Sequence, residues 1–278
     1  MIDLHMHTTA SDGRCTPEEL VARARDVGVT TMSVTDHDTM AGVAAATSAA
    51  EAVGITVVPG IEITSVHDGK DVHVLAYFLP ESAPGLSDLL ATQRRLRVER
   101  AVDIAGRLAR LGAPIDVDGL VEAASTRGGK SLARPQIAQA LIVAGHVATV
   151  AEAFDRYLGE DSPAYVPHHG ASPADVVALV TAGGGVASLA HPGYRPRDEI
   201  IPQLVDAGLA AIEAYHSSHD EAATARYLTL ARHHDLLVTG GSDYHGEGTR
   251  RAESFGVISL PREHLDALLT RSVRPAIR

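Results

Sequence analysis

Seven short segments of the chain are rich in the apolar and β-branched residues typical of β-strands, and in the first of them apolar and polar residues alternate with a period of two. In the first segment every second residue from Ile2 to Met6 is apolar, and the residues between and after them are polar. A strand here would place His5 and His7 on the same side. The predicted strands cover residues 2–7, 31–35, 56–63, 72–78, 185–190, 211–215 and 236–240.

Alanine-rich segments separate most of these strands, and their apolar residues recur every three or four positions, which predicts amphipathic helices. Repeated alternation of strands and helices indicates an α/β fold with a mainly parallel sheet. Seven such strands favour a closed or nearly closed barrel over an open doubly wound sheet. No GxGxxG motif follows the first strand, which excludes the simplest dinucleotide-binding fold. The predicted helices cover residues 17–27, 40–53, 173–182, 200–207 and 222–234.

The connection between residues 78 and 185 is too long for a single crossover helix. Within it, residues 86–111 carry apolar side chains on a helical period, and a second helix is predicted to begin at Arg134-Pro135, because proline is favoured in a first turn. We expect this segment to rest over one end of the barrel as a lid or wall. The predicted domains are a barrel of residues 1–79 and 166–278 and an inserted helical lid subdomain of residues 80–165.

Composition limits the classes of function. A chain of 278 residues with 45% hydrophobic and 21% charged residues is typical of a globular protein with a full core. Its formal net charge of −11 argues against binding long DNA, which needs a basic surface. Cys15 has no second cysteine to pair with, which suits a reducing compartment, and no apolar run approaches the about 18 residues that span a membrane. We therefore expect a cytoplasmic protein with no membrane partner.

Histidine and carboxylate side chains gather at the ends of the predicted strands. His5 and His7, followed by Asp12, form an arrangement typical of a metal site, because imidazole nitrogen and carboxylate oxygen bind Zn, Mn or Fe. The carboxyl ends of barrel strands share one face, and that face holds the active site. The same residue types recur at later strands as His37, Glu62, His73, His191, Asp243 and His245.

The motifs that contain these side chains have a specific order and spacing. They are Asp3-Leu4-His5-Met6-His7 with Ser11-Asp12-Gly13, Thr35-Asp36-His37-Asp38, Gly60-Ile61-Glu62, His73, Ala190-His191-Pro192 and Ser242-Asp243-Tyr244-His245. In this order they resemble the motifs of the PHP (polymerase and histidinol phosphatase) family. The resemblance implies a distorted (β/α)7 barrel that holds two or three divalent Mn, Fe or Zn ions and hydrolyses phosphoesters.

The resemblance also implies which residues bind each ion, and every ligand position is filled in this chain. Among the ligands, Asp12, His37 and His191 are expected to act in catalysis. Carried over by position, the three ligand sets are His5, His7, Glu62 and Asp243; Glu62 as a bridge with His73 and His191; and Asp12, His37 and His245.

The inserted segment resembles that of PHP nucleotide phosphoesterases in Gln93-Arg94-Arg95 through Arg100, Leu132-Ala133-Arg134-Pro135 and Ala164-Tyr165-Val166. This resemblance implies a phosphatase of small nucleotides, such as 3′,5′-bisphosphonucleotides and 5′-AMP, in which a metal-activated hydroxide attacks phosphorus in line with the leaving group. One alternative is a 5′→3′ exoribonuclease that acts on short RNA. A second alternative is a non-catalytic module that accompanies a polymerase.

Arginine and histidine residues near the expected site are candidates for contact with substrate phosphates. Arg134 would lie at a helix start, where backbone N–H groups favour anions, and Arg197 follows the fifth strand, with Arg195 as a close alternative. Each arginine is as readily explained as a solvated surface residue. His216 and His219 follow the sixth strand, where either could donate a proton to the leaving group, and we assign a substrate contact to His219.

Overall fold

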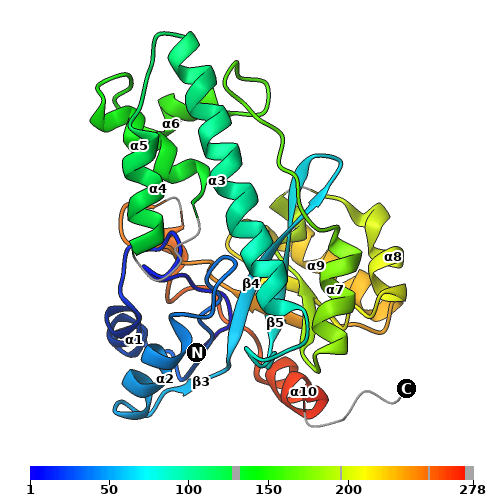
Figure 1. Cartoon of the computed structure of the whole chain (residues 1–278). Helices are drawn as coiled ribbons and strands as arrows, with labels where there is room; N and C mark the ends of the chain where they lie inside the picture. The colour runs from blue at the N-terminus through cyan, green and yellow to red at the C-terminus, as the bar shows by residue number, and fades with distance from the viewer. Residues whose placement is uncertain (127–131, 195, 250, 273–278) are drawn as a thin grey trace.

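The chain forms an α/β structure in a computed structural model that describes residues 1–126, 132–194, 196–249 and 251–272 (Figure 1). The predicted α/β class is confirmed. The described strands are β1 (Ile2–Asp3), β2 (Thr31–Met32), β3 (Thr56–Val57), β4 (Gly60–His67), β5 (Lys70–Tyr77), β6 (Val186–Leu189), β7 (Ala211–His216) and β8 (Leu237–Gly241).

Several helices begin where a polar side chain caps the first turn. Thr16, Ser172 and Asp220 each accept a hydrogen bond from the backbone N–H three residues further on. The described α-helices are α1 (Pro17–Asp26), α2 (Val43–Glu51), α3 (Leu86–Arg110), α4 (Val117–Thr126), α5 (Arg134–Val143), α6 (Val150–Ala153), α7 (Pro173–Ala182), α8 (Ile201–Asp206), α9 (Glu221–His233) and α10 (Arg262–Ser272). A π-helical turn, η1 (Phe154–Leu158), and three 3₁₀ turns, η2 (Pro192–Tyr194), η3 (Asp198–Ile200) and η4 (Ala252–Ser254), complete the set.

The described strands form two sheets, and no single closed barrel is found among them. One sheet has the order β1-β2-β3 and is parallel, whereas the other has the order β4-β5-β6-β7-β8 and is mixed. Isolated bridges join the two sheets, one from Met6 to Tyr244 and one from His37 to Glu62. The mainly parallel character was predicted, but the antiparallel pairing of β5 with both neighbours was not.

One predicted strand is divided between two observed strands, and the second of these forms a β-hairpin with the strand that follows it. The segment 56–63 was predicted as one strand, but β3 ends at Val57 and β4 begins at Gly60, on either side of Val58 and Pro59. Strand β4 then continues to His67 and returns as β5 through Asp68 and Gly69, both of which have positive φ. Such a two-residue turn suits the twist of a hairpin. The hairpin brings Glu62 on β4 close to the strand that carries His73.

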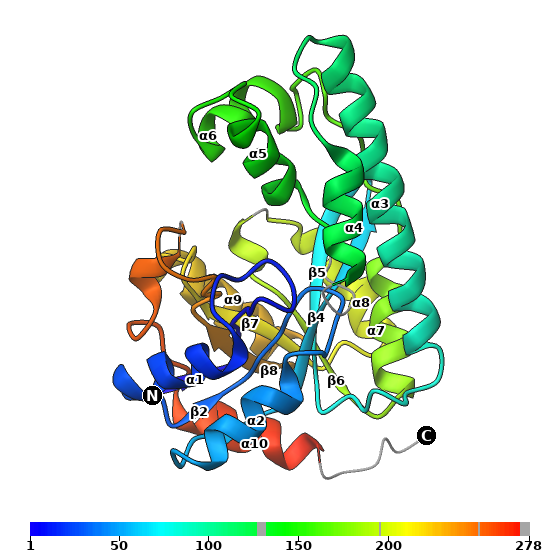
Figure 2. The same cartoon turned by 60° about the vertical axis from the view of Figure 1, so that its left-hand side comes forward.

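Helices α3 to α6 pack around an apolar cluster of their own. Figure 2 shows α3 running beside β4 and β5, with α5 and α6 above the end of the sheets. Ile104 and Leu108 on α3 meet Ile137 and Leu141 on α5 in this cluster, and all four are buried. Separate clusters lie against the five-stranded sheet and the three-stranded sheet.

A buried ion pair fixes α3 to the sheets. Arg97 on α3 donates to Asp38 through Nε at 2.9 Å and to the hydroxyl of Thr64 on β4 at 2.5 Å. Asp38 also accepts a hydrogen bond from the backbone N–H of Thr64 at 2.8 Å. Both charged side chains are buried, so this contact is a fixed part of the fold and lies one residue from His37.

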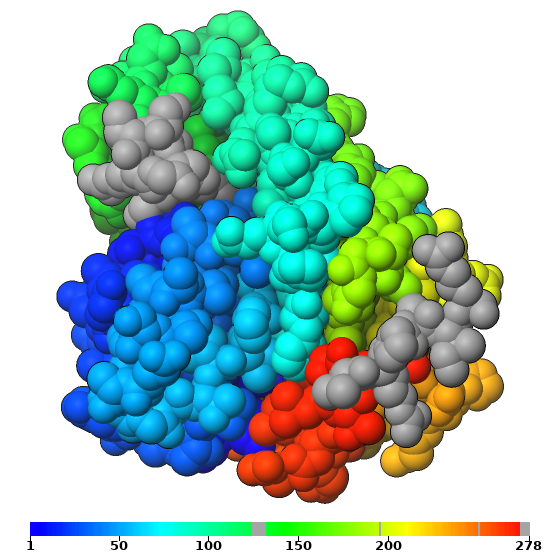
Figure 3. Space-filling view, turned by 60° about the horizontal axis from the view of Figure 1, so that its bottom comes forward, coloured from blue at the N-terminus to red at the C-terminus, as the bar shows by residue number. Residues whose placement is uncertain are grey.

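The end of the molecule away from α5 and α6 is covered by helices. In Figure 3 the N-terminal part with α1 and α2, in blue, and α10, in red, adjoin each other on this face. Among the residues described, no helix is long and apolar enough to span a membrane.

Substituting Arg97→Ala should strongly destabilise the protein. The change leaves the Asp38 carboxylate buried without its cation, which costs about 3–5 kcal/mol in the free energy of unfolding. Urea unfolding measures this loss. Arg95→Ala is the matched control, because Arg95 on the same helix forms an exposed pair with Glu99 that contributes about 0.3–0.5 kcal/mol. Equal losses of unfolding free energy in the two variants would contradict the stabilising role of the ion pair between Arg97 and Asp38.

Candidate metal centre

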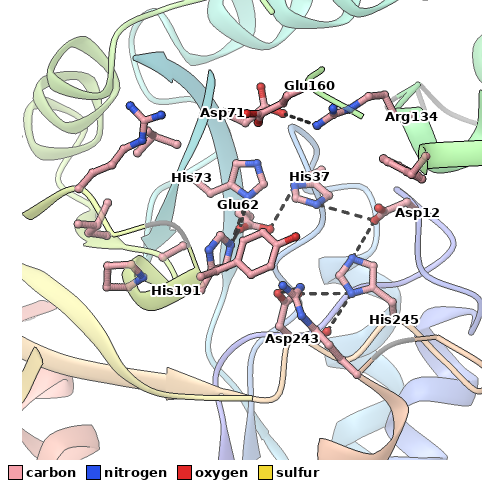
Figure 4. Close-up of a pocket in the computed structure, with 18 of the residues that line it drawn as sticks. Asp12, His37, Glu62, Asp71, His73, Arg134, Glu160, His191, Asp243 and His245 are labelled. Carbon is pink, nitrogen blue, oxygen red and sulfur yellow. Dashed lines mark hydrogen bonds and ion pairs between the residues drawn. The ribbon is translucent and has the colours of Figure 1, made fainter. Parts of the chain in front are cut away.

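The predicted metal ligands lie together beneath the inserted helices. Figure 4 shows seven of them, from six different strands or the loops after them, pointing toward one another. These seven line a cavity of about 330 Å³. His5 and His7 lie directly beneath and are fully buried. The residues that line the cavity from this set are Asp12, His37, Glu62, His73, His191, Asp243 and His245.

Four side chains form a compact group at the floor of the cavity. Nε2 of His5 lies 3.3 Å from Oε2 of Glu62 and 3.5 Å from Oδ1 of Asp243. Nε2 of His7 lies 3.2 Å from each of the same two oxygens. Ligand atoms about 2.1 Å from an ion in tetrahedral geometry stand about 3.4 Å apart. The spacing of these four atoms therefore fits a divalent ion among them.

The second oxygen of Glu62 faces another pair of histidines. Its Oε1 lies 2.8 Å from Nδ1 of His73 and 3.0 Å from Nε2 of His191, and these two nitrogens are 3.3 Å apart. His37 also reaches Glu62, with Nδ1 at 3.1 Å from Oε2. Glu62 is thus shared between two groups of nitrogens, as a bridging carboxylate would be.

A third group surrounds Asp12 at the cavity wall. Its Oδ1 lies 3.3 Å from Nε2 of His245 and 4.0 Å from Nε2 of His37. Nδ1 of His7 lies 3.8 Å from the same oxygen, so this group adjoins the floor group. The four residues are close enough for all of them to contact one ion.

Buried ligand atoms in these groups have no hydrogen-bond partner. Buried polar atoms in proteins are almost always hydrogen-bonded, since an unpaired one costs free energy. A group of unpaired nitrogen and oxygen atoms that face each other is therefore the environment that a cation would stabilise. The unpaired atoms are Nε2 of His5, Nδ1 and Nε2 of His7, Nδ1 of His37, Oε2 of Glu62 and Oδ1 of Asp243.

The protonation states of the side chains also suit metal binding. Burial lowers the pKa of His7 to about 4 and the pKa values of His37 and His191 to about 3. These histidines are therefore neutral near pH 7, as a metal ligand must be. Burial alone would raise the pKa of Glu62, but the interactions with the surrounding histidines outweigh it and hold that pKa well below its usual value. Glu62 is therefore ionised. Two of the surrounding histidines, His5 and His73, have raised pKa values despite their burial because carboxylates lie beside them, and the pKa of His5 is raised to about 10.

Hydrogen bonds from the loops hold the ligands in place. Asp36 accepts from the backbone N–H of Thr8 at 2.7 Å and from the hydroxyl of Ser11 at 2.6 Å, which fixes the loop that carries Asp12. His191 and Asp243 both have positive φ, a conformation that costs free energy in non-glycine residues and is common at functional sites. At His191 and Asp243 the backbone therefore has a costly conformation of the kind that is common at functional sites.

The close approach of β8 to the first strand depends on a glycine. A Cβ atom at Gly241 would collide with the backbone nitrogen of His5. Beside it, the backbone N–H of Asp243 donates to the carbonyl of His5 at 2.8 Å. This contact places Asp243 next to His5, although the two residues lie at opposite ends of the sequence.

The residues predicted to contact the substrate differ in whether they line the cavity. Arg134 and Arg197 both line the cavity, and Arg197 donates to the carbonyl of His67 at 3.3 Å. Arg195 lies outside the described residues. His219 is absent from the lining among the residues described: its Nε2 accepts from the backbone N–H of Gly193 at 3.0 Å and its Nδ1 lies 2.8 Å from the carbonyl of Ala214. These bonds do not support the predicted substrate contact of His219, which stays a prediction.

Arg134 is held in place by its surroundings. Its guanidinium lies 5.7 Å from the ring centres of both Phe154 and Tyr165, and NH2 lies 3.8 Å from Oδ2 of Asp71. Cations over aromatic rings are stabilised by the electrons of the ring face. Arg134 therefore presents a fixed positive charge on the side of the cavity opposite the metal ligands (Figure 4).

Three polar residues at this site, Arg251, Asp71 and Glu213, were not singled out as site residues from the sequence, whereas His216 was considered there as a proton donor to the leaving group. Arg251 contacts Asp243, Asp71 lines the cavity, and Glu213 and His216 contact His5 and Asp243 from below. One signal was available, since Glu213 is a carboxylate in an otherwise apolar predicted strand. Arg251 lies in a loop with no pattern that would reveal its position.

Comparisons with known proteins identify the family that the chain belongs to. The pattern of the PHP domain matches residues 3–96. The chain is 33% identical to the 5′-3′ exoribonuclease of Haemophilus influenzae, over 87% of this chain and 89% of that protein. It is 35% identical to the phosphoribosyl 1,2-cyclic phosphate 1,2-diphosphodiesterase of Eggerthella lenta, over 88% and 94% respectively.

Two further matches cover almost the whole chain. The 3′,5′-nucleoside bisphosphate phosphatase of Chromobacterium violaceum is 32% identical over 90% of this chain and 89% of its own. A solved structure from Bifidobacterium adolescentis, named as a metal-dependent phosphoesterase, has a TM-score of 0.88 and 35% identity over 98% of this chain and 96% of that one.

Substituting His37→Ala or Asp243→Ala should weaken the binding of Mn²⁺ to metal-depleted protein, because each removes an atom that faces the proposed ions. The loss should exceed the about 10–100-fold that removing a residue behind a ligand typically costs. Isothermal titration measures it, with exposed His233→Ala on α9 as the control. Wild-type Mn²⁺ affinity in both variants would refute this ligand set.

Proposed function

Because the chain belongs to the PHP domain family of metal-dependent phosphoesterases, we propose that it hydrolyses phosphate monoesters of small nucleotides, such as 3′,5′-bisphosphonucleotides and 5′-AMP. Two or three divalent ions are its proposed cofactors, and Mn, Fe and Zn all suit nitrogen and oxygen ligands. The proposed ligands are His5, His7, Asp12, His37, Glu62, His73, His191, Asp243 and His245.

The observation that supports this function most strongly is the shared carboxylate of Glu62. Its two oxygens face different nitrogens, His5 and His7 on one side and His73 and His191 on the other. Divalent ions bound at such a site supply a water of lowered pKa and stabilise the charge of a phosphoryl group. Glu62 holds the histidines at the spacing that this chemistry needs.

The three residues proposed to act in catalysis are among the five proposed ligands that a substrate can reach, since His73 and His245 are also partly exposed, at 20% and 16%. The side chains of Asp12, His37 and His191 are 11%, 13% and 13% exposed, whereas those of His5 and His7 are 0% exposed. The phosphate group would therefore meet Asp12, His37 and His191 at the cavity surface, above the buried ligands. No side chain is required as a nucleophile in this scheme.

Arginines on the far wall would bind the rest of the substrate. Arg134 is fixed between two aromatic rings, and Arg197 faces the same cavity. Guanidinium groups bind phosphate oxygens through two parallel hydrogen bonds and keep their charge at all working pH values. A nucleotide with a second phosphate could reach both the metal ligands and this wall.

The size of the cavity favours a small substrate. At about 330 Å³ it lies at the lower end of the about 300–1,000 Å³ of ligand pockets. A 5′→3′ exoribonuclease acting on short RNA is the main alternative, and the relative in Haemophilus influenzae carries that name. A non-catalytic role beside a polymerase is supported less, because every proposed ligand position holds a side chain that can bind metal.

The proposal includes two statements about architecture. We regard the two sheets as parts of one distorted (β/α)7 barrel, which the bridges from Met6 to Tyr244 and from His37 to Glu62 support. We regard residues 80–165 as an inserted lid subdomain and residues 1–79 and 166–278 as the barrel. The separate apolar cluster of α3 to α6 supports this division.

A substrate panel tests the proposed function. Manganese-loaded enzyme should release inorganic phosphate from adenosine 3′,5′-bisphosphate faster than it releases mononucleotides from a 5′-phosphorylated trinucleotide, and His37→Ala should lose both activities. A cyclic phosphodiester of ribose 5-phosphate belongs in the panel because of the Eggerthella lenta relative. Faster release of mononucleotides would favour the exoribonuclease, and no hydrolysis of any phosphoester would favour the accessory role.

Arg134→Ala should raise KM for adenosine 3′,5′-bisphosphate by about 10-fold or more and leave kcat nearly unchanged. The reason is the loss of a charged hydrogen bond to the remote phosphate, worth about 1.5–3 kcal/mol. Steady-state phosphate release measures both constants. Arg95→Ala on the exposed face of α3 serves as the control. Unchanged KM and kcat in Arg134→Ala would show that Arg134 does not bind the substrate and serves only in its contacts within the protein.

A further inference from the structure

Strand β7 carries two buried polar residues that the ligand set does not use. Glu213 and His216 are 0% and 1% exposed. Strand β7 lies between β6 and β8, and each of these two strands is followed by proposed ligands. The pairing of β7 with β8 shifts register between Glu213 and Tyr215, which marks a bulge. Residues three apart in a regular strand face opposite sides, so the bulge allows both side chains to face the metal centre.

Glu213 holds two proposed ligands at once. Its Oε1 lies 2.9 Å from Nδ1 of His5, and its Oε2 accepts a hydrogen bond from the backbone N–H of His191 at 2.7 Å. A carboxylate at Nδ1 keeps the proton on that nitrogen and leaves Nε2 free for metal. Nε2 of His5 is the atom that faces Glu62 and Asp243.

The hydrogen bonds of His216 determine which of its nitrogens carries a proton. The backbone N–H of Ser218 donates to Nδ1 of His216 at 3.1 Å, so Nδ1 is an acceptor. In the neutral ring the proton is then on Nε2, which lies 3.3 Å from Oδ2 of Asp243 and donates to it. The other oxygen of Asp243, Oδ1, faces His5 and His7.

We propose that β7 is the positioning strand of the metal centre, with Glu213 orienting His5 and His191 and with His216 orienting Asp243. Neither residue would touch an ion or the substrate. This inference rests on the ligand set proposed above. His191 belongs to a different proposed ion from His5 and Asp243, so Glu213 would link two metal positions through one carboxylate.

An ion held directly by Glu213 is the competing explanation. His5, Glu213 and His216 offer atoms close enough together to bind one. However, Nδ1 of His216 already accepts from Ser218, and its Nε2 faces Asp243. Binding an ion through Nδ1 of His5 as well as Nε2 would require a fully deprotonated ring. Hydrogen bonding explains the contacts of all three residues without this requirement.

Glu213→Gln tests the proposal with little change in volume. The amide has one acceptor oxygen for two donors, so either His5 or the backbone of His191 must face an NH₂ group. Isothermal titration of metal-depleted protein with Mn²⁺ should show a dissociation constant about 10–100-fold higher than in the wild type. Thr239→Val is the matched control, because Thr239 is equally buried, pairs with Glu213 in the sheet and has its hydroxyl 2.8 Å from that of Ser188.

The outcomes separate the possible explanations. Wild-type Mn²⁺ affinity in Glu213→Gln would overturn the role of β7 while leaving the ligand set intact. Loss of one bound ion with unchanged affinity for the others would overturn it in favour of Glu213 as a ligand. A wild-type protein that binds no Mn²⁺ would overturn the ligand set itself, and the inference with it.

His216 provides a second test if Glu213→Gln does not fold, which circular dichroism of the metal-depleted protein would reveal. His216→Gln keeps an N–H donor for Asp243, whereas His216→Leu removes it. We expect His216→Leu to bind Mn²⁺ at least about 10-fold more weakly than the wild type and His216→Gln to recover most of that loss. Equal affinities in the two variants would show that donation to Asp243 has no part in metal binding.

Discussion

The carboxylate of Glu62, buried among histidine nitrogens, is the constraint on which the rest of the structure depends. A buried carboxylate needs cations or hydrogen-bond donors, because its charge loses the stabilisation of water. Burial lowers the pKa values of His7, His37 and His191, so among the rings around Glu62 only His5 and His73, whose pKa values neighbouring carboxylates raise, can carry positive charge without a metal. Divalent ions on both sides of Glu62 would supply it. The unpaired atoms that face this carboxylate indicate the same requirement.

The fold brings this group of residues together from distant parts of the sequence. Bridges join the two sheets at Met6 and Tyr244 and at His37 and Glu62, beside the ligands themselves. The ion pair of Arg97 with Asp38 attaches the inserted helices one residue from His37. The same helices place Arg134 over the cavity. Stability, ligand geometry and substrate binding therefore depend on the same few contacts.

The sequence predicted the elements with strong local patterns and missed those that depend on tertiary contacts. The helix at 86–111 was predicted within one residue of α3, since its apolar period is long and regular. The hairpin of β4 and β5 was missed because the predicted strand ended at residue 63, although Asp68-Gly69 is a residue pair typical of a two-residue hairpin turn. The ligand motifs were recognisable by residue type and order. Arg251 was not, because only the folded chain brings it to Asp243.

Diffraction from a crystal of the manganese-loaded protein, recorded at the absorption edge of manganese, tests the central claim most directly. We predict at least two anomalous peaks, one on each side of the Glu62 carboxylate, with His5, His7 and Asp243 around one and His73 and His191 around the other. Manganese found only elsewhere on the molecule, with Glu62 contacting no ion, would contradict the claim that these side chains form the metal centre.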